Sequence, residues 1–274
     1  MKRVVLIYRA PVFSPNSEKK DKAILDAVGN VLTRVGYETR FVQEEELLAE
    51  DDGDVFLSMA RLPETLEVLA EKERQGRRVV NSTEGVRLAT ARLRIDRLMR
   101  DNDIPTAPRC DGPCGEHGYW LKRGDAAAQN LYDVQFAATW DDVERKLGYF
   151  HQRGINEVLI CEHVVGDVVK FYGVQGTDFF RCYYPTDDGQ TKFDDEVRNG
   201  VAHHYHFDVS SLRANADRLS RLSGLPVYGG DCIVRADGSY AIIDFNDWPS
   251  FARCREDAAE HIGQLIIDNL IIDN

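Results

Sequence analysis

The stretch GGDCIVRADGSYAIIDFNDWPSFA, residues 229–252, decides the fold of this chain. It predicts two β-strands, DCIVR and YAIIDF, joined by a turn at residues 236–238. Because side chains two residues apart on a strand share a face, Asp244 and Asn246 project together, and Asp231 lies on the partner strand. The hairpin therefore gathers three oxygen ligands of the kind that Mg²⁺ binds together with substrate phosphates.

A solvent-exposed hairpin is the alternative interpretation of these polar side chains, since a pair of this kind on a strand usually faces water. Asp244 and Asn246 end an apolar run, residues 241–243, that has the character of a buried strand. A buried carboxylate is costly unless a cation or a hydrogen-bond donor compensates it. The sequence context therefore favours metal binding over a surface role.

The hairpin resembles the metal hairpin of the ATP-grasp superfamily, which includes D-alanine ligases, glutathione synthases, glutamate-adding ligases of ribosomal protein modification, and inositol trisphosphate kinases. The shared pattern is a G-x-D strand followed by D-G and I-D-x-N-x-x-P, ending at Pro249. The resemblance implies that Asp231, Asp244 and Asn246 hold two Mg²⁺ ions that bridge the phosphates of ATP. Many relatives carry glutamate at the position of Asp244, and aspartate is also used in the superfamily.

The N-terminal part of the chain alternates short β-rich runs, such as VVLIY at 4–8, with helical periods. This alternation is typical of βαβ units and a mostly parallel sheet. Together with the resemblance, it implies an α/β chain with the α+β ATP-grasp fold. We expect an N-terminal Rossmann-like domain in residues 1–82, followed by two α+β subdomains that grip ATP, a central one in residues 83–165 and a C-terminal one in residues 166–274.

Helix signals mark several boundaries in the same region of the chain. We expect one helix from a cap at Ser82 or Thr83 to about Asp101. Thr139 is the expected cap of a second helix, and Gly224 is expected to close a third. The loop RAPVFSPNSEKK after the first strand lies where open α/β sheets bind ligands, although a solvated surface loop is an equal alternative.

Two cations before the hinge match phosphate-binding positions of the resembled family. Arg92 occupies the place of the early helix cation, with Arg94 as its rival and a solvated arginine as the alternative. Lys122, in the strand YWLKRG, matches the lysine that reaches the α and β phosphates. A lysine within an apolar strand needs an anion for its ammonium group, which favours the same role. The following loop, residues 123–133, has one glycine where relatives have several.

The segment VLICEHVVG matches the strand that leads into the interdomain hinge. The resemblance implies that adenine forms hydrogen bonds with backbone atoms of residues such as Cys161 and His163. It also implies that Glu162 or Asp167 binds the ribose hydroxyl groups. The sequence therefore predicts the nucleotide base at this strand.

Basic and polar residues beyond the hinge are further candidates. Lys170 matches a basic residue that many relatives place after the hinge. Arg181 in FFRCYYP, and Arg198 with Asn199 in EVRNG, fall where relatives contact the γ-phosphate or the substrate. A charged residue on a hairpin is usually solvated, so a surface role stays open for each of them.

Composition limits the class of ligand. The chain has 274 residues and a formal net charge of -12, which disfavours long-range attraction to nucleic acid or to an anionic membrane. No run approaches the roughly 18 apolar residues that span a bilayer, and the N-terminus has no signal cleavage site. We expect a cytoplasmic protein whose partners are ATP and small-molecule substrates. Oligomeric state cannot be read from the sequence, and a homodimer stays open.

Six cysteines are scattered along the chain, several of them inside apolar runs, which predicts reduced, buried thiols and no structural disulfide. Zinc is an alternative role for two segments, Cys110-x3-Cys114-x2-His117 and HHYH at 203–206. Neither segment supplies four ligands at a familiar spacing.

The implied reaction is in-line transfer of the γ-phosphoryl group of ATP to a substrate carboxylate, followed by attack of an amine on the acyl phosphate. One alternative is a small-molecule kinase of the inositol phosphate type, which a chain with few basic clusters fits poorly. A second alternative is a MgATP-binding module without catalysis, suggested by the glycine-poor loop.

Overall fold

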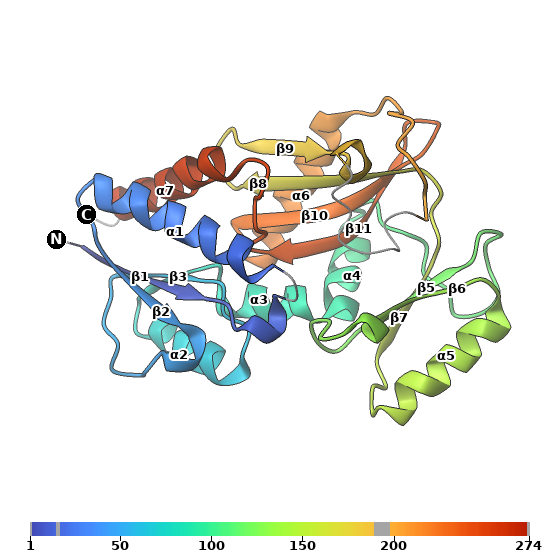
Figure 1. Cartoon of the computed structure of the whole chain (residues 1–274), viewed down its shortest axis with the longest axis horizontal. Coiled ribbons are helices and arrows are strands. Elements are labelled where there is room, and N and C mark those ends of the chain that lie inside the picture. Colours follow the sequence, from blue (N-terminus) through green and yellow to red (C-terminus); the bar gives the residue numbers. More distant parts are fainter. Residues whose placement is uncertain (1, 15–16, 189–197, 273–274) are drawn as a thin grey trace.

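The computed structural model describes residues 2–14, 17–188 and 198–272. Within these ranges the strands form two four-stranded sheets and one three-stranded sheet (Figure 1). In chain order the elements are β1 Arg3–Tyr8, η1 Pro11–Phe13, α1 Glu18–Arg34, β2 Glu38–Gln43, η2 Glu44–Glu46, β3 Val55–Ser58, α2 Pro63–Arg74, β4 Arg78–Val80, α3 Thr83–Thr90, α4 Arg92–Asp101, β5 Tyr119–Arg123, η3 Leu131–Asp133, β6 Val134–Ala137, α5 Trp140–Gln152, β7 Val158–Glu162, β8 Asp167–Val174, β9 Phe180–Tyr183, η4 Pro185–Asp188, α6 Val209–Ser223, β10 Val227–Val234, β11 Tyr240–Asp247 and α7 Arg255–Ile272.

The N-terminal sheet has the strand order β2-β1-β3-β4, and all of its pairs are parallel. Successive residues of β1 point to opposite faces, as the two-residue period of a strand requires. Val4 and Leu6 pack into one core with α1 and α7, while Val5 and Ile7 pack into a second core with Leu69 of α2. Burial on both faces explains the continuous apolar run of β1 and confirms the expected parallel sheet.

The C-terminal sheet is antiparallel, with the order β11-β10-β8-β9. One of its faces carries Phe171, Tyr228 and Phe245, which pack against apolar residues of α4 and α6 such as Ile95 and Leu212. The residues that alternate with these aromatic side chains point to the opposite face of the sheet. That opposite face carries the carboxylates of the predicted metal hairpin.

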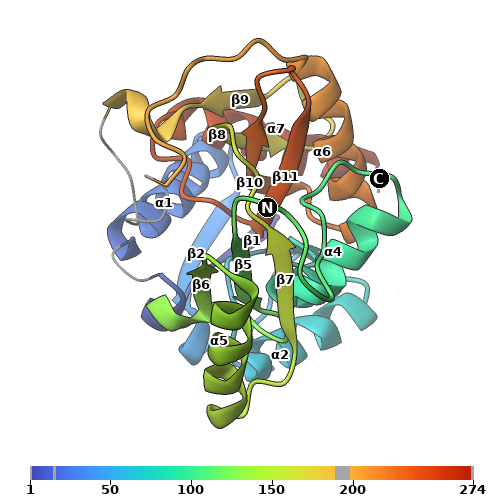
Figure 2. The ribbon, with the colours of Figure 1, turned by 90° about the vertical axis from the view of Figure 1, so that its right-hand side faces the viewer.

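The three-stranded sheet has the order β6-β5-β7 and is also antiparallel. Helix α5 covers one of its faces through Val143 and Phe150, which pack on Leu121. A small cluster that includes Cys161, Ile233 and Ala241 joins β7 to β10 and β11. Figure 2 shows the end of β7 beside these two strands. The other face of this sheet is thereby held beside the polar face of the C-terminal sheet.

The expected continuous helix from residue 82 to residue 101 is wrong, because the structure divides it into α3 and α4. Ala91 leaves helical geometry with φ -90° and ψ 88°. The amide of Leu93 donates to the carbonyl of Gly124 at 3.2 Å, which ties the start of α4 to the end of β5. The break leaves Arg92 in the first turn of α4.

The expected absence of a disulfide is also wrong, because Cys110 and Cys114 are bonded to each other. Their Cα atoms lie 6.3 Å apart across a short loop. The free cysteines of the described residues are Cys161, Cys182, Cys232 and Cys254. Sequence spacing could not indicate the pairing of Cys110 with Cys114, because contacts from residues outside the loop shape the chain between them. Cys110 is held by β7 and Cys114 by the Tyr119 hydroxyl.

Helix termini follow the expected capping residues. The Thr139 side chain accepts a hydrogen bond from Asp142 N, and Gly224 closes α6 with φ 71°, a left-handed conformation that glycine adopts without strain. Among the described residues, no helix is both long enough and apolar enough to cross a bilayer.

Ser82 caps α3 and links it to the loop after α6, so Ser82→Ala is expected to lower the free energy of unfolding by about 1 kcal/mol. Its hydroxyl accepts a hydrogen bond from Gly85 N at 3.1 Å and donates one to Gly224 O at 3.0 Å. Urea denaturation measures the loss. Ser17→Ala is the matched control, because Ser17 precedes α1 without a capping hydrogen bond; an equal loss in both variants would contradict the capping role.

Candidate functional site

A row of three charged side chains crosses the polar face of the C-terminal sheet. Asp231 on β10 lies directly opposite Lys170 on β8 and opposite Asp244 on β11. The ammonium group of Lys170 lies 3.1 Å from Oδ1 of Asp231. Directly opposite residues of neighbouring strands have closely spaced side chains, so the two carboxylates and the ammonium form one group.

Asn246 extends this row along β11. Its Nδ2 donates a hydrogen bond to Oδ2 of Asp244 at 3.2 Å, which holds the amide and the carboxylate on the same face. Gly229 and Gly230 lie opposite this end of the strand. A side chain at Gly230 would collide with the backbone oxygen of Asp244, so the close approach of the two strands requires glycine there.

Lys122 and Arg92 bring positive charge to the row from two other parts of the chain. Lys122 reaches from β5 to donate a hydrogen bond to the backbone oxygen of Ile243 at 2.7 Å, one residue from Asp244. The Nε and Nη1 atoms of Arg92 are buried and have no hydrogen-bond partner within the part of the chain that the structure describes. A buried guanidinium with unused donors is suited to bind an anion.

The charge state of Asp244 reflects these cations. Burial alone would raise the pKa of Asp244, but the charges of Arg92, Lys122 and Lys170 and the hydrogen bond from Asn246 hold that pKa below its ordinary value. Asp244 is therefore ionised at neutral pH. An ionised carboxylate beside a second carboxylate and an amide oxygen is the ligand set that a hard divalent cation prefers.

The residues present fit Mg²⁺ and a triphosphate. Asp231, Asp244 and Asn246 offer oxygen ligands, while the unused nitrogens of Arg92 and the ammonium of Lys122 offer donors to phosphate oxygens. The structure brings these five predicted residues together from β5, α4 and the late hairpin.

A second buried charged cluster, which sequence reasoning did not identify, lies at the carboxyl ends of β1 and β3. Arg9 follows β1, Arg61 follows β3 by a few residues, and both contact the carboxylate of Asp247, the last residue of β11. Exposed fractions of the three side chains are 7%, 14% and 1%. Arg9 also approaches Asp21 of α1 at 3.4 Å.

The charge of Asp244, in the row on the C-terminal sheet, acts on the Arg61 guanidinium. Burial alone would lower the pKa of Arg61, but the charges of Asp247, Asp21 and Asp244 raise it above its ordinary value. Glu44 fixes the backbone around the cluster, because its carboxylate accepts hydrogen bonds from the amides of Ala10 and Arg61. A charged residue just after a buried strand was the signal available in the sequence, since ligands bind where parallel strands end.

Cys161 and His163, the residues predicted to bind adenine, lie at the end of β7 and just after it. Cys161 of β7 and Lys122 of β5 point to the same face of the three-stranded sheet. Burial raises the pKa of the Cys161 thiol to about 11. His163 accepts a hydrogen bond from Trp120 Nε1 at Nδ1, and burial with the charges of Arg198 and His117 lowers its pKa. The backbone amide of His163 already donates to Gly118 O, so this amide is not available to adenine.

Of the two residues predicted to bind ribose, Glu162 points away from Lys122 and the carboxylates of the hairpin, and Asp167 is held by other partners. Glu162 is paired in register with Tyr119 and points to the face of the small sheet opposite Lys122, beside Cys110 and Cys114. Asp167 is buried and accepts hydrogen bonds from the amides of residues 203 and 205 at 2.7 and 2.8 Å. The structure therefore brings neither carboxylate to the row of metal-binding candidates.

The remaining candidates, Arg181, Arg198 and Asn199, each have a protein partner. Arg181 shares the face of Lys170 and pairs with Asp257 of α7. Arg198 lies over the ring of Phe136, 3.6 Å from its centroid, and Asn199 donates to the backbone oxygen of Val164 at 3.3 Å. These contacts hold the segment after β9 against the small sheet.

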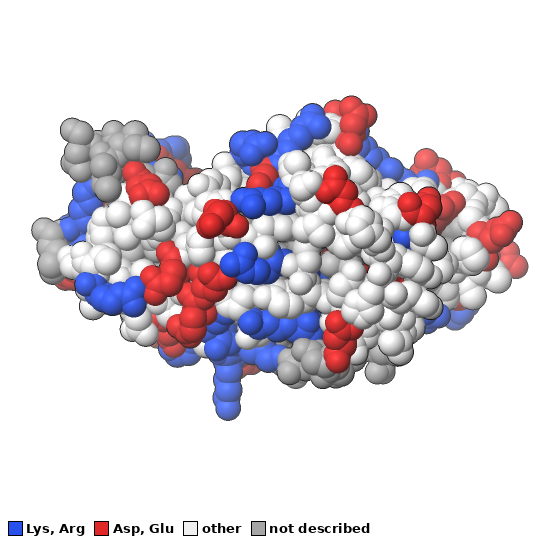
Figure 3. Space-filling view, turned by 90° about the horizontal axis from the view of Figure 1, so that it is seen from above, with Lys and Arg blue, Asp and Glu red and all other residues white. Residues whose placement is uncertain are grey.

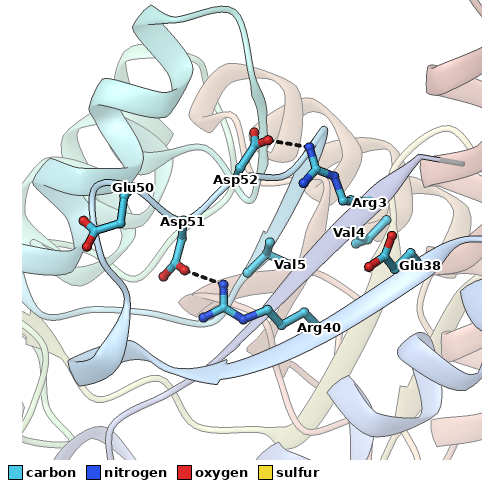
Figure 4. Close-up of a pocket in the computed structure, with 8 residues that line it drawn as sticks. All are labelled: Arg3, Val4, Val5, Glu38, Arg40, Glu50, Asp51 and Asp52. Atoms are coloured by element: carbon cyan, nitrogen blue, oxygen red, sulfur yellow. Dashed lines mark hydrogen bonds and ion pairs between the residues drawn. The ribbon is translucent and has the colours of Figure 1, made fainter.

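A cavity of about 250 Å³ lies elsewhere, near the amino ends of β1 and β2 (Figure 4). Both of its arginines are paired with aspartates, Arg3 with Asp52 and Arg40 with Asp51. The cavity lies at the amino end of the parallel sheet, whereas Arg9 and Arg61 lie at its carboxyl end. It includes none of the residues of the charged row on the C-terminal sheet.

Solved structures similar to this chain cover nearly all of it. A RimK-domain ATP-grasp protein from Sphaerobacter thermophilus superposes with a TM-score of 0.66 at 19% identity, covering 97% of this chain and 99% of that protein. The D-alanyl-alanine synthetase A of Vibrio cholerae gives 0.69 at 10% identity, covering 98% of each chain. A D-alanine–D-alanine ligase from Bacillus anthracis, solved with ATP, gives 0.63 at 12% identity, covering 99% of this chain and 98% of that one. No protein-family model and no curated protein sequence matches the chain.

Proposed function

The chain has the ATP-grasp fold, and on this premise we propose that it is an ATP-dependent ligase that activates a small-molecule carboxylate for attack by an amine. The observation that carries the proposal is the row of Lys170, Asp231 and Asp244 beside the unpaired buried nitrogens of Arg92. Structures named as D-alanine–D-alanine ligases are among the similar structures, and one of them was solved with ATP.

In the proposed complex the triphosphate lies between the small sheet and the C-terminal sheet. Asp231, Asp244 and Asn246 hold Mg²⁺, which supplies charge neutralisation on phosphate oxygens. Arg92 donates its free nitrogens to the phosphate chain, and Lys122 exchanges its hydrogen bond to Ile243 O for a phosphate oxygen. Lys170 sits at the end of the row and adds positive charge where the γ-phosphoryl group is transferred.

The acceptor carboxylate binds on the side of Arg61 in this proposal. Arg61 has a buried guanidinium whose Nη1 forms no hydrogen bond or ion pair within the described ranges, while its Nε and Nη2 contact Asp247. Open α/β sheets bind ligands beyond the carboxyl ends of their strands, where Arg61 lies. A carboxylate bound by Arg61 would lie near the row, since the charge of Asp244 acts on Arg61, and acyl phosphate formation needs acceptor and phosphate close together.

The three sheets support the division of the chain into residues 1–82, 83–165 and 166–274 as the N-terminal domain and two gripping subdomains. Each sheet lies inside one of these ranges. Arg181, Arg198 and Asn199 belong to residues 166–274, and we assign them to substrate contacts. To make these contacts they leave their present protein partners. Adenine binds beside Cys161 and His163, and a carbonyl rather than the His163 amide receives its hydrogen bond.

We place the protein in the cytoplasm, where ATP is abundant, with small molecules rather than nucleic acid or membrane as partners. On the face that lies over β9, α6 and α7, Lys and Arg side chains alternate with Asp and Glu (Figure 3). Interspersed charge of this kind gives no broad positive field for a polyanion.

An ADP-release assay tests the proposed function. The purified chain is incubated with MgATP and a panel of carboxylates, amines and hydroxy compounds, each alone and in pairs. We expect ADP release that needs a carboxylate and an amine together, with one amide formed per ADP. Release that needs a hydroxy compound alone identifies a kinase. Tight Mg²⁺-dependent ATP binding without turnover on any pair identifies a binding module and contradicts the ligase assignment.

A further inference from the structure

Three side chains with metal-binding atoms gather at the face of the three-stranded sheet that is opposite the Lys122 side chain. The sulfur atoms of Cys110 and Cys114 and a carboxylate oxygen of Glu162 all lie within 4.8 Å of one another. Cys110 is buried and the other two are partly buried. Among the described residues, Cys110, Cys114 and Glu162 form the group of three potential metal ligands whose atoms lie this close together. The histidines at residues 203–206 belong to no such group.

The backbone fixes these three residues relative to one another. Cys110 N donates to Ile160 O at 3.0 Å, and Glu162 N donates to Pro108 O at 2.9 Å, so the segment before the loop pairs with β7. The amide of Cys114 donates to the hydroxyl of Tyr119 at 3.0 Å. Cys110 and Glu162 are therefore held on a short antiparallel ladder, and Cys114 lies in the loop that Tyr119 holds over it.

The carboxylate of Glu162 has no donor facing it. The side-chain carboxylate of Glu162 forms neither a hydrogen bond nor an ion pair in the part of the chain that the structure describes, although the residue is partly buried. The loop closes directly over this carboxylate, because a side chain at Gly115 would lie 3.0 Å from its Oε1. A partly desolvated anion without a donor is costly, and a cation would remove that cost.

We propose that the reduced chain binds one Zn²⁺ ion through Cys110, Cys114 and Glu162, and that the disulfide is the oxidised, metal-free state of the same site. A dithiol reductant supplies two electrons and two protons to the disulfide, which gives two thiols and leaves the reductant as a disulfide. Zinc binding then releases the two thiol protons, and solvent supplies the fourth ligand.

Ligand chemistry separates this site from the nucleotide site. Thiolate sulfur favours Zn²⁺ over Mg²⁺, while the carboxylates of Asp231 and Asp244 favour Mg²⁺. Tetrahedral zinc with bonds of about 2.3 Å needs sulfur atoms roughly 3.8 Å apart, so opening of the disulfide within the observed cluster is sufficient. A reducing compartment keeps such a pair as thiols and so keeps the site available to metal.

Metal titration of the full chain tests the proposal. The protein is reduced, freed of reductant without oxygen, and titrated with Zn²⁺ and separately with Co²⁺ in excess Mg²⁺, which occupies oxygen sites. We expect one equivalent of Zn²⁺ in competition with a chromogenic chelator, and a thiolate-to-cobalt charge-transfer band. The oxidised chain is expected to bind none.

Variants identify the ligands. Cys110→Ser and Cys114→Ser are each expected to lose the cobalt band, and Glu162→Gln to bind Zn²⁺ more weakly by at least about tenfold, since even loss of an outer partner costs that much. Cys254→Ser is the control, because its free thiol lies outside the cluster. Circular dichroism checks that each variant is folded. Absence of stoichiometric zinc in the reduced wild type, or equal affinity in Glu162→Gln, overturns the proposal.

Discussion

Asp244→Asn is expected to lower MgATP turnover by about 10²- to 10³-fold, or more, while the fold is retained. The change keeps the size of the side chain but removes the negative charge that faces Asp231 across the hairpin and lies near Arg92, Lys122 and Lys170. In the proposed site the variant removes one of two carboxylate ligands of Mg²⁺, so the Mg²⁺ concentration that supports half-maximal rate should rise as the rate falls. Steady-state ADP release across a Mg²⁺ series measures both.

Asp237→Asn is the matched control for this experiment. Asp237 lies in the turn of the same hairpin, where its carboxylate accepts hydrogen bonds from Ser239 at 2.9 Å and 2.7 Å. The same chemical change there should leave turnover and Mg²⁺ dependence as in the wild type. Turnover by Asp244→Asn within a factor of about two of the wild type would remove Asp244 from the metal site.

Asp247→Ala is expected to lower the free energy of unfolding by about 3–5 kcal/mol at neutral pH, because it leaves two buried guanidinium groups without their shared carboxylate. Arg9 and Arg61 both contact Asp247, whose side chain is 1% exposed. Burial alone would raise the pKa of Asp247, but the charges of Arg61 and Arg9 hold it below its ordinary value. Urea denaturation at neutral pH measures the loss.

The pH dependence of this effect has a defined sign. A depressed carboxyl pKa contributes stability that is present above the pKa of the unfolded chain, about 3.9, and is lost as pH falls through the folded value. Wild type and Asp247→Ala should therefore approach each other in stability in acid. Persistence of the full difference well below the folded pKa would show that the carboxylate charge is not its cause.

Two further variants separate charge from packing at this cluster. Asp247→Ala combined with Arg61→Leu should recover part of the lost stability, because one uncompensated cation is removed together with its partner. Glu260→Ala breaks the exposed pair with Arg34, whose side chains are 53% and 62% exposed, and should leave the unfolding midpoint unchanged. A double variant less stable than Asp247→Ala would contradict the unpaired-charge explanation.

The central part of the site could be predicted because it depends on local rules. Asp244 and Asn246 share a face by the two-residue period of a strand, and the turn at residues 236–238 returns the chain so that Asp231 meets Asp244. Lys122 was predicted from an apolar strand that needed an anion for its charge. The structure places the Lys122 ammonium one residue from Asp244, through its hydrogen bond to Ile243 O.

The outer part of the site could not be predicted in the same way. Glu162 and Asp167 match hinge positions in sequence, but strand register turns one toward the cysteine pair and backbone amides occupy the other. The loop that begins at Arg9 was a candidate ligand site, but its pairing with Arg61 was missed, because each arginine is an ordinary charged residue after a strand. Their shared partner, Asp247, is separated from Arg9 by 238 residues along the chain.

The sequence by itself determined most of the order of helices and strands, the parallel character of the first sheet and the oxygen-rich face of the late hairpin, because periodicity and turn residues act over a few positions. It did not show the break between α3 and α4. Only the tertiary structure decided that Arg92, Lys122 and Asp244 meet, that Asp247 neutralises two distant arginines, and that Glu162 faces Cys110 and Cys114. Such contacts depend on how sheets pack and in which register strands pair, and those choices are made by burial and charge compensation across the whole chain.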